Sequence, residues 1–132
     1  MSNKKTGNAF EAEFCQKLFD AGFWVCNLTQ NEAGQPADVI AVKRTMATLI
    51  DCKVCTNDIF QFSRIEPNQK TAMKLWRDCG NANACFALKF SDGSVWMIDD
   101  YMLEMLSKTR TSIDNISICK YGTSLERWLE LW

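Results

Sequence analysis

The 132-residue chain contains no histidine and no apolar run long enough to cross a membrane. The lack of histidine removes a common zinc ligand and therefore argues against a structural zinc protein. The polar residues 1–5 are not followed by an apolar stretch, so we expect no signal peptide and a cytoplasmic protein without membrane association.

No charge of one sign dominates the chain. Fifteen Lys and Arg residues against 16 Asp and Glu residues give a formal net charge of −1 and a pI of about 5.4. This balance argues against indiscriminate nucleic-acid binding but allows a local basic stripe. Because there are also no repeats, low-complexity tracts or linkers, we expect one domain over residues 1–132.

The seven cysteines are an odd number and are scattered through the expected helices and strands. This distribution argues against a secreted disulfide framework. Cys52-x-x-Cys55 has the spacing of a metal knuckle, but Cys79 and Cys85 are too far apart to make a second one. We interpret the cysteines as buried free thiols, and a zinc or redox module remains an alternative.

The hydrophobic pattern predicts helices that alternate with strands. Gly22 is a stop signal for the first helix, Pro67 suits the first turn of the second, and Ser91-Asp92-Gly93 is a hairpin signal. The predicted order is helix 8–21, strand 23–29, polar loop 30–35, strand 38–42, turn 43–46, strand 47–54, irregular loop 56–65, helix 67–80, strands 84–90 and 95–98, helix 100–107, strand 116–119 and a helix from 123. The fold class is therefore α/β or α+β, with a mixed sheet flanked by helices.

Two neighbouring strands carry ionisable residues where apolar ones would be expected. Asp38 begins one strand, and in the next strand Asp51 and Lys53 share a face with Leu49. The opposite face is apolar and should pack in the core. Ionised groups in a strand interior are costly unless they are paired or bind a metal ion. The alternative is a plain ion pair between Asp51 and Lys53 on an exposed sheet face. The presence of Asp38 on the neighbouring strand favours a site over this alternative.

A further acid lies on the first predicted helix. The positions three, four and seven residues after Glu11 are apolar, whereas those after Glu13 are polar. Glu11 therefore lies in the buried stripe, where a carboxylate needs a partner. The alternative is that Glu11 sits at the margin of the stripe and reaches solvent.

These groups suit metal-assisted hydrolysis of a phosphodiester. The carboxylates of Glu11, Asp38 and Asp51 are ligands for a hard cation, most simply Mg²⁺, for which Mn²⁺ would substitute. Lys53 would orient the attacking water or offset charge on the phosphoryl oxygens.

Several basic residues predict contacts with DNA. Lys70, Lys74 and Arg77 form a basic stripe on the helix 67–80, opposite its apolar stripe. Arg64 lies in the preceding loop with Phe60 and Phe62, which could meet a backbone or bases. Near the N-terminus, Asn8 begins the first predicted helix, and the preceding Lys4 and Lys5 could form a flexible arm that contacts phosphates.

The order of Glu11, Pro36-x-Asp38 and Asp51-x-Lys53 resembles the PD-(D/E)xK nuclease superfamily. Gly7-Asn8-Ala9-Phe10-Glu11 at the start of a helix, Ala21-Gly22-Phe23, Phe62-x-x-Ile65-x-Pro67-x-Gln69 and Ser124-Leu125-Glu126 resemble small Holliday junction resolvases of archaeal, phage and RecU type. Asp51 stands where glutamate is commoner, and the loop 30–35 contains Glu32 where basic and hydroxyl residues are usual.

This resemblance implies a restriction-endonuclease-like fold and a role in DNA recombination and repair in a bacterial, archaeal or phage-infected cell. It implies that Glu11, Asp38, Asp51 and the main-chain carbonyl of Cys52 bind the metal ion, that Lys53 is catalytic, and that Gln69 lies beside them. It also implies a homodimer, because a two-fold four-way junction needs two sites related by a two-fold axis. The alternatives are a restriction, repair or nicking nuclease on the same fold, or a module that binds DNA or protein without cutting.

Overall fold

The structure is a computed structural model that describes residues 3–28 and 37–132, with side chains described from Thr6 onward. Its main feature is a six-stranded sheet in the order β1-β2-β3-β5-β6-β8. These strands are β1 (Trp24–Asn27), β2 (Val39–Lys43), β3 (Met46–Cys55), β5 (Asn83–Phe90), β6 (Val95–Asp99) and β8 (Thr123–Ser124). The central pair β3 and β5 is parallel and the other neighbours are antiparallel, so the sheet is mixed, as predicted.

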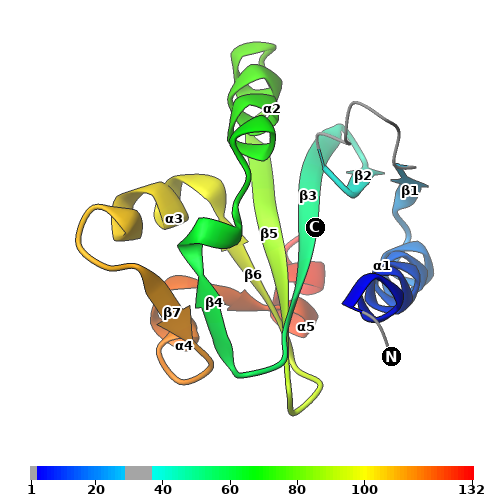
Figure 1. The fold of residues 1–132 in the computed structure, drawn as a ribbon. Coiled ribbons are helices and arrows are strands. Elements are labelled where there is room, and N and C mark those ends of the chain that lie inside the picture. The colour runs from blue at the N-terminus through cyan, green and yellow to red at the C-terminus, as the bar shows by residue number, and fades with distance from the viewer. Residues whose placement is uncertain (1–2, 29–36) are drawn as a thin grey trace.

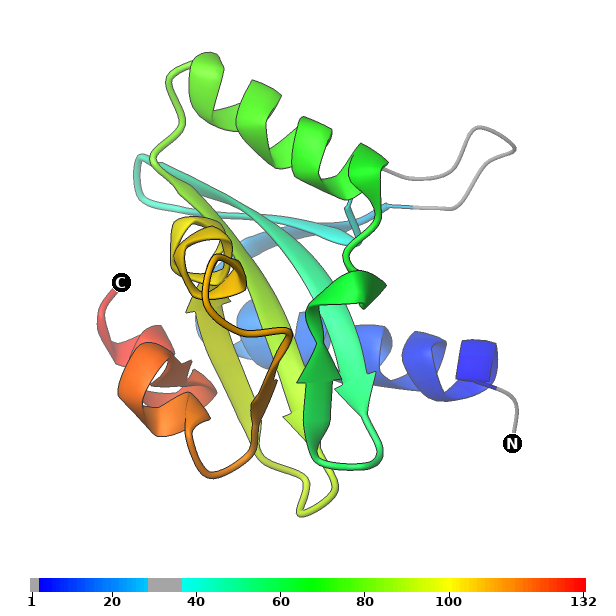
Figure 2. The ribbon, with the colours of Figure 1, turned by 60° about the vertical axis from the view of Figure 1, so that its left-hand side comes forward.

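Helices cover both faces of this sheet (Figures 1 and 2). In Figure 2, α1 (Asn3–Asp20) crosses behind the sheet, and α2 (Pro67–Asp78) and α3 (Asp100–Ser107) lie in front of it. The α1 face is a core that includes Phe14, Ile50 and Leu125. The opposite face is a second core that includes Met73 and Leu103. The smaller elements on this side are β4 (Ile59–Gln61), η1 (Phe62–Arg64), β7 (Ser112–Asp114) and α4 (Ile118–Tyr121), while α5 (Leu125–Glu130) joins the first core.

Local signals explain where the elements near the site begin and end. After α1 the chain reverses at Gly22, whose φ of 95° favours glycine, and Lys43 Nζ donates to the carbonyl of Ala21 at 2.8 Å. Helix α2 has proline at its first position and a capping box between Glu66 and Gln69. Because β3 and β5 are parallel, the chain between them must cross over, and this connection carries α2.

The structure corrects the N-terminal predictions. Helix α1 begins at Asn3, whereas we predicted a start at residue 8, so the backbone of Lys4 and Lys5 is helical and does not form an extended arm. Their side chains lie outside the described residues, as does the predicted loop 30–35. Strand β1 covers Trp24–Asn27 of the predicted strand 23–29.

Two predictions after β3 are also wrong. The segment 56–65 is ordered as β4 and η1, and Phe60 and Phe62 are buried in the core, so their rings are not available to stack on bases. The predicted strand 116–119 overlaps α4, and the strand of this region is β7. The physical reason is the Asp114 carboxylate, which accepts hydrogen bonds from the N–H groups of Ile116 and Ser117 and turns the chain. In the part of the chain that the structure describes, no helix is long and apolar enough to span a bilayer.

The buried position of Phe60 gives a stability prediction. Its ring is fully buried and contacts those of Phe62 and Phe86 at centroid distances of 6.1 and 6.3 Å. We expect Phe60→Ala to lower the free energy of unfolding by about 3–5 kcal/mol, measured by urea unfolding. Ile116→Ala is the matched control, because Ile116 is 78% exposed and its truncation should change stability by less than about 0.5 kcal/mol. Equal effects of the two substitutions would contradict the assignment of Phe60 to the core.

Candidate active site

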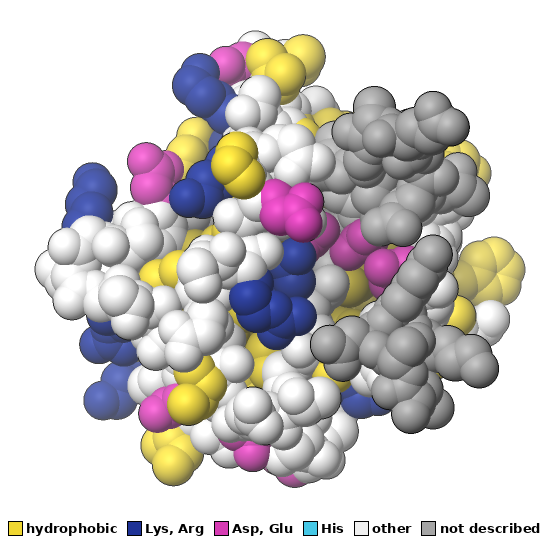
Figure 3. Space-filling view, in the orientation of Figure 1, with side chains coloured by type: hydrophobic (Ala, Val, Ile, Leu, Met, Phe, Trp, Pro, Cys, Tyr) yellow, Lys and Arg dark blue, Asp and Glu magenta, His cyan; other side chains and the backbone are white. Residues whose placement is uncertain are grey.

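Most of the predicted site residues meet at one cleft of about 510 Å³ between α1, the strands β2 and β3, and the start of α2. Figure 3 shows acidic side chains next to basic ones in the middle of this face. The predicted residues that line the cleft are Glu11, Asp38, Asp51, Cys52, Lys53, Arg64 and Gln69. Residues as far apart in the sequence as Glu11 and Gln69 are thus brought together.

Asp38 and Asp51 face each other across the β2–β3 pair. The register pairs Val39 with Ile50, and the N–H of Asp38 donates to the carbonyl of Ile50 at 3.1 Å. The N–H of Cys52 donates to Asp38 Oδ2 at 2.7 Å, which orients this carboxylate. The predicted convergence of the two acids follows directly from antiparallel pairing.

Gln69 connects Asp51 to Lys53. Its Nε2 donates to Asp51 Oδ1 at 3.1 Å, and its Oε1 accepts from Lys53 Nζ at 3.3 Å. The same Oε1 accepts from the N–H of Glu66 at 3.0 Å as part of the capping box of α2. The cap that begins the helix therefore also fixes which way the Gln69 amide faces.

The electrostatics of the cleft are unfavourable to three simultaneous negative charges. Burial and, after it, the neighbouring charge of Asp38 raise the pKa of Asp51 to about 7 against the opposing effect of Lys53. Burial also raises the pKa of Glu11 to about 7, together with the charge of Asp38 and a hydrogen bond shared with it. A cation in the cleft would favour the ionised form of both groups.

The residues fit a hard cation. Asp51 is 1% exposed, and its buried Oδ2 accepts no hydrogen bond, although Lys53 Nζ forms an ion pair with it at 3.2 Å. Oxygen donors of this kind suit Mg²⁺ or Mn²⁺. Within residues 3–28 and 37–132, no three Asp, Glu or Cys side chains are already arranged as a metal-binding group, so the carboxylates that would hold a cation have yet to close around one.

The predicted DNA-contacting residues are distributed over several surfaces. Arg64 lines the cleft, and its Nη1 donates to the carbonyl of Val54 at 2.8 Å. Lys70 and Lys74 instead line a second cavity of about 460 Å³ between α2 and α3. Asn8 is exposed on α1. Arg77, which we placed in the same basic stripe, is committed to Asp99 and Asp100.

Sequence reasoning missed several residues that line the cleft: Thr6, Gly7, Thr56, Asn57, Gln61 and Glu66. For Glu66 a signal was present, because an acid followed three residues later by glutamine, with proline between them, indicates a helix start. Thr56 and Asn57 lie on a connecting segment, Gln61 ends the three-residue strand β4, and Thr6 and Gly7 lie in α1 before its predicted start. None of these places carries a periodic signal.

Cys52 and Cys55 do not form a metal site together. All seven are free thiols, and only some are buried, since Cys79 and Cys119 are exposed. Cys52 packs against the α1 core, whereas Cys55 belongs to the core on the α2 side. The two thiols therefore face opposite sides of β3 and cannot chelate one ion together.

Two strand carboxylates, a lysine two residues after the second one and a helix carboxylate, all on a mixed sheet of this topology, define a nuclease of the PD-(D/E)xK class. The family model for the archaeal Holliday junction resolvase (Hjc) matches residues 2–131. The chain therefore belongs to this family of metal-dependent nucleases, which act on DNA junctions.

A solved structure confirms the fold. Hjc from Archaeoglobus fulgidus, described as a Holliday junction resolvase from an archaeal hyperthermophile, superposes with a TM-score of 0.72 at 20% sequence identity. The match covers 93% of this chain and 99% of that chain. No curated protein matches the sequence.

The raised pKa of Asp51 predicts how stability depends on pH in the metal-free protein. A carboxyl group with a pKa of about 7 when folded and near 3.8 when unfolded favours folding at low pH. Its contribution is lost as pH rises from about 4 to about 7, by roughly 2–4 kcal/mol. In EDTA, Asp51→Asn should thus be more stable than wild type at pH 8 and similar to it at pH 4. Urea unfolding across this range checks the difference, and a difference independent of pH would refute it.

Proposed function

We propose that this chain cuts four-way DNA junctions by Mg²⁺-dependent hydrolysis of phosphodiester bonds at the cleft. The observation that carries the proposal is the buried Asp51 carboxylate, with one oxygen lacking a hydrogen bond, beside Lys53 and opposite Asp38. A buried acid of this kind is costly in a purely structural role and favourable in a metal site.

In this proposal Glu11, Asp38, Asp51 and the main-chain carbonyl of Cys52 hold the cation, and Mn²⁺ substitutes for Mg²⁺. When bound, the cation activates a water molecule and offsets the charge that develops on the phosphate. Asp38 is already oriented by the N–H of Cys52, so binding requires little rearrangement of this ligand.

Lys53 acts on the attacking water and on the phosphoryl oxygens. Its side chain is 13% exposed and its Nζ lies between Asp51 Oδ2 and Gln69 Oε1, at 3.2 and 3.3 Å. A charge held by two oxygens at the wall of the cleft is preorganised to stabilise negative charge in the transition state. Gln69 keeps the ammonium in place, and hydrolysis leaves a 5′-phosphate, as in the family.

DNA contacts come from basic and polar side chains in the cleft and on the neighbouring helices α1 and α2. Arg64 is the nearest, because it lines the same cleft as the catalytic groups. Asn8, Lys4 and Lys5 on α1, and Lys70 and Lys74 on α2, would extend the contacts along the backbone. The net charge of −1 is compatible with this arrangement, since it is the local field that attracts phosphates.

We further propose a homodimer in which each copy is a single domain. Two opposed cuts in a four-way junction require two sites related by a two-fold axis. Large apolar side chains that remain exposed on α2 and α3 of one copy support association, among them Leu75, Tyr101 and Met105. Light scattering during size-exclusion chromatography measures the mass directly.

Cleavage of a labelled four-way junction and of a matched linear duplex tests the activity. We expect paired, symmetric cuts on the junction with Mg²⁺ and none with EDTA. Asp51→Asn and Lys53→Met should each slow cutting by at least about 10²-fold, because the first weakens binding of the cation and the second removes a positive charge beside the reacting phosphate. Lys120→Met, on the exposed surface of α4, is the matched control and should cut at the wild-type rate.

Each other outcome of that assay has a defined meaning. Equal cutting of junction and duplex would refute junction selectivity but would still support nuclease activity. Tight junction binding without cutting would favour the module that binds DNA without cleaving it.

Arg64 gives a separate test of the DNA surface. Removing one phosphate contact lowers the salt dependence of binding, so Arg64→Met should weaken junction binding and reduce the slope of log K against log salt by about 1. Fluorescence anisotropy on wild type and variant measures both quantities. Arg127→Met is a suitable control, because Arg127 is exposed on α5 and pairs only locally with Glu130. An unchanged slope for Arg64→Met would place the DNA elsewhere.

A further inference from the structure

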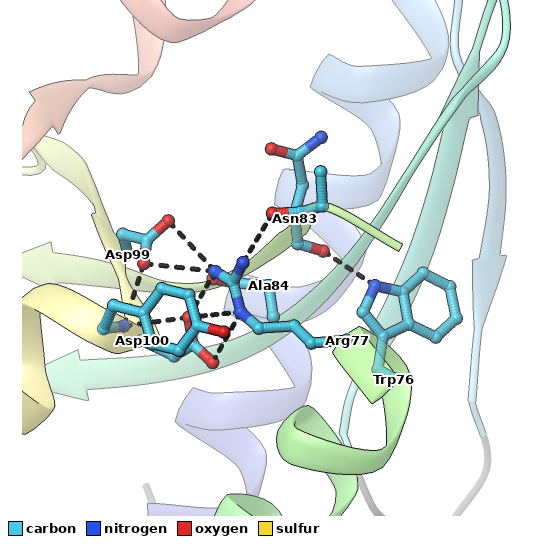
Figure 4. A network of polar contacts seen from close by, with 8 residues as sticks. Trp76, Arg77, Asn83, Ala84, Asp99 and Asp100 are labelled. Carbon is cyan, nitrogen blue, oxygen red and sulfur yellow. Dashed lines mark hydrogen bonds and ion pairs between the residues drawn. The ribbon is translucent and has the colours of Figure 1, made fainter. Parts of the chain in front are cut away.

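The C-terminal end of α2 is held by a dense set of contacts around Arg77 (Figure 4). Arg77 Nε donates to both carboxylate oxygens of Asp100, at 3.0 and 3.1 Å, and Nη2 donates to those of Asp99, at 3.1 and 3.2 Å. Nη1 donates to the carbonyl of Ala82 at 2.6 Å. The guanidinium carbon lies 3.9 Å from the centroid of the Tyr101 ring. With a side chain only 11% exposed, Arg77 is not available to contact DNA.

The preceding residue adds to this anchor. Trp76 Nε1 donates to the carbonyl of Asn83 at 2.8 Å, so Trp76 and Arg77 together bind the chain where it enters β5 (Figure 4). Asp99 is the last residue of β6 and caps α3 by accepting from the N–H of Tyr101 at 2.8 Å. The contacts therefore tie α2 to β5, β6 and α3 at once.

Apart from these polar contacts, helix α2 is held at this end mainly by the partly buried Trp76 ring, which packs against the core. Only Gln69 and Met73 are fully buried, and Leu75 is 58% exposed. Apolar burial along the helix is thus small, and the polar contacts of Arg77 carry much of the orientation.

The spacing along α2 connects this anchor to the active site. Met73 lies midway between Gln69 and Arg77, about 6 Å from each along the helix axis. A helix that pivots on its buried residue moves its two ends by similar amounts in opposite directions. A tilt of about 10° would displace Gln69 by about 1 Å, enough to break its 3.3 Å bond with Lys53 Nζ.

We propose that Arg77 is a positioning residue of the nuclease site, which clamps the far end of α2 so that Gln69 bridges Asp51 and Lys53. This inference rests on the proposed function, because it assigns Arg77 an effect on catalysis that passes through Gln69. Among the described residues, none of the hydrogen-bond partners of Arg77 lines the catalytic cleft, so its effect there is on geometry.

Single-turnover cleavage of the four-way junction tests the proposal. We expect Arg77→Met to lower the cleavage rate by about 10- to 100-fold, because displacement by about 1 Å has this cost in an active site. The Kd for the junction should change less than about twofold, since the substitution removes no DNA-contacting side chain and a shift of about 1 Å is small for exposed lysines. Arg127→Met should leave both quantities unchanged. Rates are compared at a temperature at which circular dichroism shows every variant folded.

A double-mutant cycle with Gln69→Ala separates positioning from a general loss of stability. If Arg77 acts through Gln69, Arg77→Met should change the rate less than about threefold in the Gln69→Ala background. Rate losses that multiply in the double variant would overturn the inference. A wild-type rate in Gln69→Ala alone would instead refute the proposed role of Gln69 at the site, so the two failures are distinguishable.

A milder variant covers the case in which Arg77→Met does not fold. Trp76→Phe removes the indole donor to Asn83 and keeps a smaller aromatic ring against the core, and we expect a loss of about two- to fivefold that again disappears in the Gln69→Ala background. The side-chain amide signals of Gln69, assigned by their loss in Gln69→Ala, should shift in spectra of Trp76→Phe and not of Arg127→Met. Unshifted amide signals with a wild-type cleavage rate would overturn the inference.

Discussion

A carboxylate buried in the middle of a sheet is the constraint on which most of the molecule depends. Asp51 is 1% exposed in β3, and burying a charged group costs several kcal/mol unless neighbours compensate it. Lys53 and Gln69 supply two of these neighbours, and Gln69 can do so only because α2 begins with a capping box at the right place. The same crossover between β3 and β5 therefore brings α2 to the site and allows the two strands to pair in parallel.

Proximity of like charges makes the metal-free cleft a compromise. Asp38 opposes Asp51 across the strand pair and shares a hydrogen bond with Glu11, so protons take the place that a cation would fill. The metal-free protein is thus more stable when fewer of these carboxylates are ionised, whereas a cation binds better when more of them are. This tension is common where chemistry is performed, since active sites trade stability for reactive geometry.

The sequence alone was sufficient to predict β3 and which side chains lie on each of its faces, because alternation with period two is decisive when one face is apolar. Ile50 and Cys52 pack under α1 while Asp51 and Lys53 face the cleft, as predicted. It was also sufficient for the stripe that places Glu11 at the site. It failed for Phe60 and Phe62, whose alternation is too short to distinguish a three-residue strand from a loop. It failed again for Arg77, whose partners lie 22 and 23 residues away and leave no periodic signal.

The two edges of the sheet differ from its centre in length. Strand β3 has ten residues and β5 has eight, whereas β8 at one edge has two and β1 at the other has four in the described part of the chain. A short edge strand offers few free N–H and C=O groups to an incoming strand. A second copy therefore gains little by lengthening this sheet at β8. The short edge strands thus lower the tendency of the folded chain to aggregate edge to edge.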